Sequence, residues 1–470
     1  MDPTRQLLTE SVKAKWKPIL EHNSLPEIKD SYKKHCTTLL LENEERFLRE
    51  TYQGISGTQL GTSIPGAGTT TGIDSFDPIL ISLVRRAMPN LMAYDLAGVQ
   101  PMTGPTGLIF AMKSRYGSVS GTGARTGSEA LFNEADTGHS GANLGGTHLG
   151  NMGDLFQDDS GNTDGRFEPG RGMTTVQGEG SNFNEMSFTI EKTAVEAKTR
   201  ALKAEYTLEL AQDLKAVHGL DAETELANIL STEIMFEINR ELVRMIYDVS
   251  KLGAQQADLA SYSTPVFGTT KGGVYDLEKD SDGRWSAEKF RGLLFQIERE
   301  ANTIGSETRR GRGNMVVASP DVISALSMSG ILDFSPAFNS AMSTDVNGST
   351  LAGTLSGGKI KVYLDPYSTP THTETWTPVN YVCVGYKGTS PYDAGLFYCP
   401  YVPLQMVRAV DTSTFQPKIG FKTRYGMVSN PFVLGTDSAP DAMRLQRRRN
   451  QYYRIFRVDN LHGNDASYGG

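Results

Sequence analysis

The chain has 470 residues, enough to form two or more lobes with separate hydrophobic cores. Its 49 glycines predict many turns and long loops, and its formal net charge of −8 argues against tight DNA wrapping, which needs a basic face. The spacing of Cys36, Cys383 and Cys399 suggests neither a disulfide framework nor a metal site, and no apolar leader or membrane-length run is present. These features predict a protein that begins in a reducing cytoplasm.

Residues 1–50 differ in composition from the rest of the chain. They are rich in charge and poor in glycine, and apolar residues recur at helical spacing in two stretches separated by Pro18 and Pro26. Residues 53–72 then change to glycine, serine and threonine, which is typical of an extended arm. The sequence therefore predicts a helical N-terminal segment over 1–50 and an arm over 51–76.

The next two segments contrast in apolar content. Within 77–117 we expect a short helix after Asp77-Pro78, then a strand, a turn at 103–107 and a second strand ending at Tyr116. Segment 118–184 is dominated by Gly, Asn, Asp and Ser. A stretch that long with so few apolar anchors is either a functional loop or a small inserted domain.

Segment 185–304 combines a strand with long helices. Alternation from Met186 through Ile190 predicts the strand, and an apolar stripe from Leu226 to Leu252 predicts a helix capped by Asp221 and ended by Gly253. Such a helix would be about 45 Å long. A second helix is expected over 287–304.

The remainder is predicted to be mostly strands, divided into 305–400 and 401–470. A buried strand at 315–318 precedes a helix opened by Pro320. Further strands are expected at 359–364, 381–384, 395–398, 404–407 and 420–427. The fold class is therefore α+β, without an internal repeat.

Two motifs resemble ligand sites incompletely. The segment from Gly353 to Lys359 nearly spells a phosphate-binding loop, but Ile360 replaces the magnesium-binding hydroxyl and a strand follows, so we interpret it as a turn. Residues 158–165 resemble part of a calcium loop, but Arg171 stands where a bidentate glutamate is needed. A polar surface loop is favoured there, with incidental calcium binding left open. We predict no catalytic residue, no metal ligand and no cofactor.

A basic cluster lies near the C-terminus: Arg444, Arg447, Arg448 and Arg449, followed by Arg454 and Arg457. DNA contact, a solvated face and ion pairing with a neighbouring subunit are the alternatives. Subunit contact is favoured because the protein as a whole is acidic.

The triplet [Leu/Ile]-x-Glu is confined to the N-terminal segment. It ends at Glu10, Glu21, Glu27, Glu42 and Glu50, which are five of the seven glutamates in residues 1–50. None of the twenty glutamates that follow ends such a triplet. This asymmetry suggests a degradable segment joined to a body from which the same signal is absent.

Several blocks resemble the major capsid proteins of T-even-type tailed bacteriophages. They are RRAMPNL at 85–91, YDLAGVQPM at 94–102, GPTG at 104–107, NEAD at 133–136, LELAQDL at 208–214, AVHG at 216–219, EIM at 233–235, EINRE at 237–241, FQP at 415–417 and GFKTRYG at 420–426. The resemblance runs from about residue 13 to 458. It departs at 118–184, where this chain is shorter than relatives that carry an inserted domain.

The resemblance implies a Hong Kong 97-like capsid fold and a structural role, not an enzyme. The Gly/Thr stretch would be the N-terminal arm, 77–117 would begin the peripheral lobe and the outgoing strand of an extended loop, and 118–184 would be that loop's tip or a reduced inserted domain. Segment 185–304 would hold the returning strand, the spine helix (222–252) and peripheral lobe, 305–400 the axial lobe, and 401–470 the return to the peripheral lobe.

The resemblance also implies assembly and trimming. The chain would form hexameric capsomers of an icosahedral or prolate DNA-containing head in the host bacterial cytoplasm; the related pentameric vertex protein is the alternative. Its partners would be itself, the vertex protein, scaffold, portal, prohead protease, decoration proteins and packaged DNA bound without sequence specificity. The protease would read Leu48 and Glu50 and cut before Thr51, with secondary cuts after Glu10, Glu21, Glu27 and Glu42.

Overall fold

The computed structural model describes residues 3–21, 28, 30–55, 91–117, 129–131, 135, 139–141, 172–179, 183–254, 273–278, 280–281, 285–333, 351–365, 380–390, 392–410, 416–430 and 448–461. The expected arm beyond Ile55, the short helix after Asp77-Pro78, the calcium-like segment 158–165 and most of 118–184 lie outside these residues.

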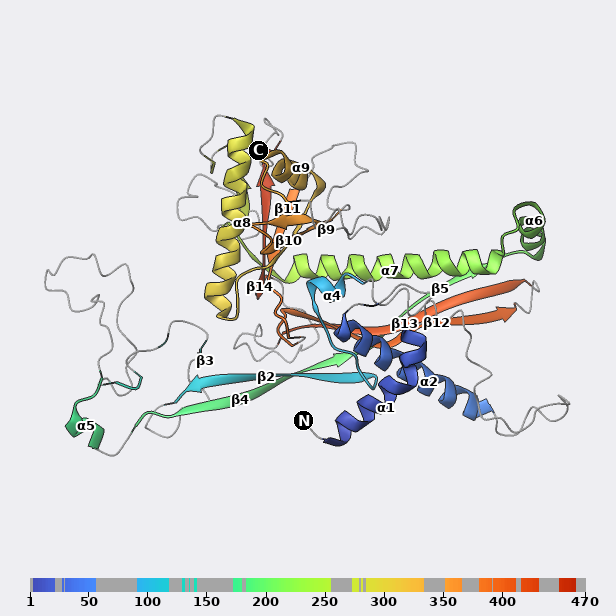
Figure 1. Cartoon of the computed structure of the whole chain (residues 1–470), viewed down its shortest axis with the longest axis horizontal. Helices are drawn as coiled ribbons and strands as arrows, with labels where there is room; N and C mark the ends of the chain where they lie inside the picture. The colour runs from blue at the N-terminus through green and yellow to red at the C-terminus, as the bar shows by residue number, and fades with distance from the viewer. Residues whose placement is uncertain are drawn as a thin grey trace.

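A long helix, α7 (Ala222–Val249), runs between the two larger sheets (Figure 1). The predicted cap is confirmed, because the Asp221 side chain accepts a hydrogen bond from the Glu223 backbone N–H at 3.3 Å. The helix is three residues shorter than expected, since Ser250–Leu252 forms strand β6. Most of the predicted apolar stripe is buried, but Ile229 is exposed.

One side of α7 is occupied by a seven-stranded mixed sheet. Its order is β6-β14-β11-β8-β10-β9, with β7 beside β14. The strands are β7 (Val274–Asp276), β8 (Met315–Ala318), β9 (Leu351–Leu355), β10 (Ile360–Leu364), β11 (Asn380–Gly385) and β14 (Asn450–Asp459). Helices α8 (Ser286–Thr308) and α9 (Pro320–Met328) pack on it, and the predicted strand at 315–318 and helix start at Pro320 are confirmed.

A four-stranded sheet lies between α7 and the N-terminal helices (Figure 1). Its order is β1-β12-β13-β5, formed by β1 (Gly98–Val99), β12 (Leu396–Val410), β13 (Pro417–Ser429) and β5 (Lys198–Glu205). The two strands expected at 395–398 and 404–407 are one strand, because register shifts after Pro400 and Val402 let the ladder continue past the prolines. Helix α6 (Leu208–His218), which the sequence analysis did not predict, follows β5.

A narrow three-stranded ribbon projects away from both sheets (Figure 1). Strands β2 (Thr106–Tyr116) and β4 (Met186–Glu196) pair antiparallel along their full length, and β3 (Glu129–Ala130) adds two residues at one edge. Short helix α4 (Ala93–Leu96) precedes β1, where a strand was expected, and α5 (Thr175–Glu179) lies beyond the ribbon.

Two helices form the N-terminal part: α1 (Pro3–Leu20) and α2 (Ser31–Ile55). The two predicted helical stretches are therefore confirmed, but Pro18 does not end the first one, because it lies inside α1. Helix α2 continues five residues past the expected boundary at 50. Thr51 to Gln53 contain no helix breaker, and Gly54 falls in the last turn, where its effect on helix stability is small.

The two sheets divide the chain differently from the predicted boundaries. Strands β6, β7 and β14 belong with the seven-stranded sheet although they lie outside 305–400, and so does helix α8, most of which precedes residue 305. Strand β12 joins the four-stranded sheet although it begins inside that range. No helix in the described ranges is long and apolar enough to cross a bilayer.

Candidate assembly surfaces

The projecting ribbon has one apolar face, which is exposed. Cross-strand register places Met112 opposite Ile190, Ser114 opposite Phe188 and Tyr116 opposite Met186, so the apolar side chains line up on one side. The large ones are between 46% and 65% exposed: Leu108, Phe110, Met112, Met186, Phe188 and Ile190. A contiguous apolar strip of this kind marks a contact surface.

The opposite face of the ribbon is polar and internally paired. Lys113 forms an ion pair with Glu191 at 2.8 Å, and Arg115 reaches the same carboxylate at 3.2 Å. The Arg115 Nε also donates a hydrogen bond to the Thr189 hydroxyl at 3.1 Å. Because these polar groups pair with one another, the two faces of the ribbon differ in kind.

The base of the ribbon is fixed to the body by a small apolar cluster. Ile109 and Val195 from the ribbon pack with Met102, Phe397 and Val428, all of them buried. The ribbon therefore leaves the body at a defined place, and among the described residues no further sheet packs behind its outer part.

A charged clamp holds α7 against the four-stranded sheet. Arg200 on β5 donates to Glu237 at 2.8 Å and to Glu241 at 2.5 Å, and the Tyr425 hydroxyl on β13 contacts both Arg200 and Glu241. The sequence contains no signal for this clamp, because its members come from three elements that lie far apart in the chain. The clamp links the long helix to β5 and β13 of the sheet.

The N-terminal helices are packed into the body. Cys36, Leu40 and Leu41 of α2 are fully buried and share a continuous core with the two sheets. The Asn43 amide donates to the backbone carbonyls of Met102 at 2.8 Å and Tyr401 at 3.0 Å. Helix α2 thus packs on the sheet face opposite α7, and α1 packs against α2.

Two glutamates of α2 have pKa values shifted in opposite directions. Burial raises the pKa of Glu44 to about 7, because its only hydrogen bond among the described residues is donated by Gln405 at 3.1 Å. Burial also opposes ionisation of Glu42, but hydrogen bonds from Trp16 at 3.0 Å and Lys15 at 3.2 Å hold its pKa below the usual value.

The near-phosphate loop is a turn, as predicted. Its residues end β9 and begin β10, with Ser356, Gly357 and Gly358 at positive φ between the two strands, and the fully buried Ile360 starts β10. Among the described residues no cluster of His, Cys, Asp or Glu could hold a metal ion.

The basic cluster is only partly placed. Arg444 and Arg447 lie outside the described residues, Arg449 is exposed, and Arg448 donates to the Tyr247 carbonyl at 3.3 Å. The inclusion of Arg454 was wrong: it is buried in β14. Arg457 is likewise paired within the chain. The intrachain partners are Glu300 and Glu307 for Arg454, and Asp459 for Arg457.

The predicted cleavage triplets fall in different surroundings. Glu21 is exposed in the turn after α1, whereas Glu42 lies half-buried between α1 and α2. Glu10 lies in α1, and Glu27 is outside the described residues. Leu48, Glu50 and Thr51 are within α2, so the expectation that this bond ends a helix was wrong by five residues.

Comparison with known proteins identifies the family of this chain. The family model described as major capsid protein Gp23 matches residues 73–458. The major capsid protein of Salmonella phage ViI is 37% identical over 439 residues, 92% of each chain, and that of Enterobacteria phage T4 is 36% identical over 92% of this chain and 93% of that protein. The capsid vertex protein of T4 is 28% identical over 58% of this chain and 59% of its own length.

Among solved structures, the capsid of Myoviridae phage XM1 aligns with 78% of this chain and 92% of its own at 9% identity and a TM-score of 0.35. That likeness is distant, and the sequence relationship carries the conclusion.

The ribbon projects from the body with its apolar face exposed, and the family match places the chain in the class of capsid shell proteins. The chain belongs to the Gp23 family of major capsid proteins and builds the shell of a T4-like phage. The predicted resemblance is confirmed. The match to major capsid proteins spans far more of the chain than the match to the vertex protein does.

Proposed function

We propose that this chain is the precursor of the shell subunit, that it assembles into hexameric capsomers with a Hong Kong 97-like arrangement, and that residues 1–50 are trimmed by the head's own protease. Its role is structural and not catalytic. Its neighbours in the head would be further copies of itself and the vertex protein, with scaffold, portal and decoration proteins also in contact. Assembly would take place in the host bacterial cytoplasm, around DNA bound without sequence specificity.

The observation that carries assembly is the apolar face of the β2–β4 ribbon. This ribbon has only two long strands, since β3 adds just two residues, and such a ribbon is at best marginally stable alone in water. It exposes a row of large apolar side chains where it extends from the body. Burying each of them would contribute on the order of 1 kcal/mol. A second copy of the chain is the occupant we favour, because a shell repeats one contact between many identical subunits.

The test compares Phe188→Ser with Thr189→Ala. Phe188 lies on the apolar face, 65% exposed, so its loss should leave the subunit folded and abolish shells. Thr189 lies on the polar face and loses only the hydrogen bond from Arg115, so this control should assemble normally. Negative-stain microscopy with circular dichroism reads both outcomes. Normal shells from Phe188→Ser would show that the ribbon's apolar face does not drive assembly.

The main cut is proposed between Glu50 and Thr51. This bond ends the last [Leu/Ile]-x-Glu triplet, and it lies within the final turns of α2, where helices fray. Local unwinding of those turns would supply the extended backbone that a protease binds.

N-terminal sequencing of mature particles should read Thr-Tyr-Gln-Gly-Ile, and Glu50→Ala should stall the particles before maturation. An intact Met1 in DNA-filled particles would contradict the trimming proposal.

A further inference from the structure

The Leu40–Glu42 triplet is the one that the fold conceals most completely among the triplets whose side chains are described. Leu40 is fully buried beneath α2, and the Glu42 carboxylate accepts hydrogen bonds from Trp16 and Lys15. Asn43, on the other side of the bond, is tied to two backbone carbonyls of the body. A protease that reads these side chains in an extended backbone could not reach them while α2 stays docked.

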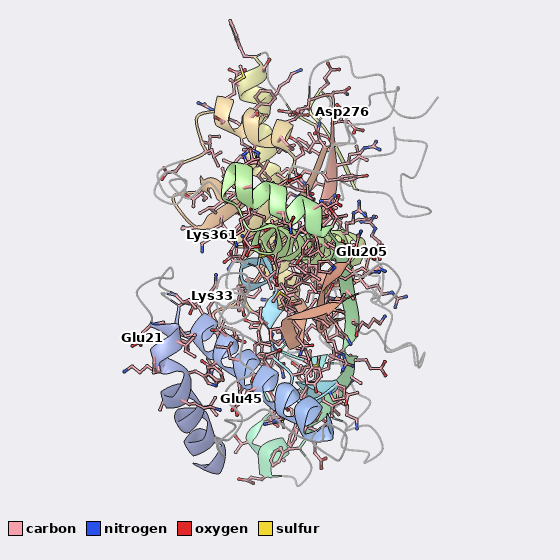
Figure 2. All side chains as sticks on the ribbon, turned by 90° about the vertical axis from the view of Figure 1, so that its right-hand side faces the viewer. Glu21, Lys33, Glu45, Glu205, Asp276 and Lys361 are labelled. Atoms are coloured by element: carbon pink, nitrogen blue, oxygen red, sulfur yellow. The ribbon has the colours of Figure 1, made fainter. Side chains whose placement is uncertain are left out.

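Glu21 provides a contrast inside the same chain. It ends an equivalent triplet but lies exposed in the turn after α1, and Figure 2 shows it at the end of that helix. The helices thus present one triplet openly and bury another.

We infer that docking of α2 on the four-stranded sheet hides the Glu42–Asn43 bond until the cut after Glu50 releases residues 1–50, so that trimming is ordered. This inference rests on the trimming proposed above. It assigns a timing role to the contact between α2 and the sheet.

The order follows from the tether. While the chain is intact, α2 is held next to its docking surface at an effective concentration on the order of millimolar, so any opening is quickly reversed. After the cut at Glu50 the same contact becomes an association between separate molecules. The Glu44 side chain also contributes little to the docking of α2, because its buried Oε1 atom has no hydrogen-bond partner among the described residues.

Concealment is first tested on the purified full-length chain, with a glutamate-specific endoprotease as the probe. Mass spectrometry should show cleavage after Glu21 at least about tenfold faster than cleavage after Glu42, since the latter waits for opening. Leu40→Ala should accelerate the Glu42 cut by roughly 30-fold or more and leave the Glu21 cut unchanged. Asn43→Ala, a milder change, should accelerate it less. Equal rates after Glu21 and Glu42 in the unaltered chain would overturn the inference.

Cys36 gives a readout that requires no protease. It is the sole cysteine of residues 1–50 and is fully buried, so a thiol reagent should modify it only when α2 opens. Its labelling rate should rise in the Leu40→Ala chain in parallel with the Glu42 cut. Rapid labelling of the unaltered chain would contradict docking.

The order itself is tested in particles that carry Glu50→Ala. The Glu42–Asn43 bond should then remain intact although its own sequence is unchanged, while the bond after Glu21 is still cut. Adding Asn43→Ala should restore the Glu42 cut. Cleavage after Glu42 at the normal rate in Glu50→Ala particles would refute the ordering but not the trimming itself. Absence of every cut in unaltered particles would refute both the trimming proposal and this inference.

Discussion

Replacing Glu44 by glutamine should strengthen the docking of α2 in a pH-dependent way. Burial raises the pKa of the folded-state carboxyl from 4.5 to about 7, so the folded chain binds a proton more readily than the open one. A carboxyl group whose pKa is raised in the docked state destabilises that state once the pH exceeds the group's ordinary pKa. This loss of stability is complete above about pH 7. This rise in the pKa of Glu44 corresponds to a destabilisation of about 3 kcal/mol.

The glutamine variant avoids ionisation, but it leaves an amide where the Oε1 atom already lacks a partner, a penalty of about 1 kcal/mol. We therefore expect a net gain of roughly 2 kcal/mol at pH 8 and no gain near pH 5. Hydrogen exchange of peptides from α2 measures this gain in docking free energy. The exchange rate of the variant is divided by that of the unaltered chain at each pH from 5 to 8, so that intrinsic exchange rates cancel.

Glu45→Gln is the matched control at the next position. It breaks the ion pair with the half-exposed Lys15 and should weaken docking by at most about 1 kcal/mol. If the Glu44→Gln ratio were the same at pH 5 and pH 8, the buried carboxylate would not be the source of the effect, and the reasoning would fail.

Three further substitutions probe other parts of the fold. Lys359→Ala should leave assembly normal, because the residue lies in a β-turn, and neither chain should hydrolyse nucleotides. An ATPase rate that disappeared in this variant would contradict the structural interpretation. Arg454→Leu leaves Glu300 buried without its cation and should lower the free energy of unfolding by about 3–5 kcal/mol in urea titration, with partial recovery on adding Glu300→Gln. Asp221→Ala removes the cap of α7 and should cost about 1 kcal/mol in the same assay; no change would show that the cap contributes nothing.

Elements with a strong local signal were predictable from the sequence. The four-residue apolar run at 315–318 followed by Pro320 specifies a buried strand and a helix start, and Asp221 with the apolar stripe specifies α7. These features depend on neighbours within a few residues, which a sequence pattern records.

Strand β14 was missed because its signal is not local. Arg454 and Arg457 interrupt its apolar alternation and suggested a basic surface cluster. Their charges are compensated by Glu300, Glu307 and Asp459, two of which lie some 150 positions earlier in the chain. Only the fold brings these groups together.

Only part of the proposed assembly surface could be predicted from the sequence. Period-two alternation from Met186 to Ile190 predicted one strand, but the pairing of that strand with β2 was needed to show that Phe110 and Met112 extend the same apolar strip. The docking of α2 could not be predicted from the sequence. Helical periodicity shows that one face of a helix is apolar, but it does not show which part of the protein packs against that face.

The central claim is that this chain is a self-assembling shell subunit, and electron microscopy of the purified full-length protein tests it most directly. The account predicts shells, tubes or hexamers, with the apolar face of the β2–β4 ribbon buried against a neighbouring copy. Persistent monomers at concentrations where family members assemble, with the ribbon still exposed, would contradict it.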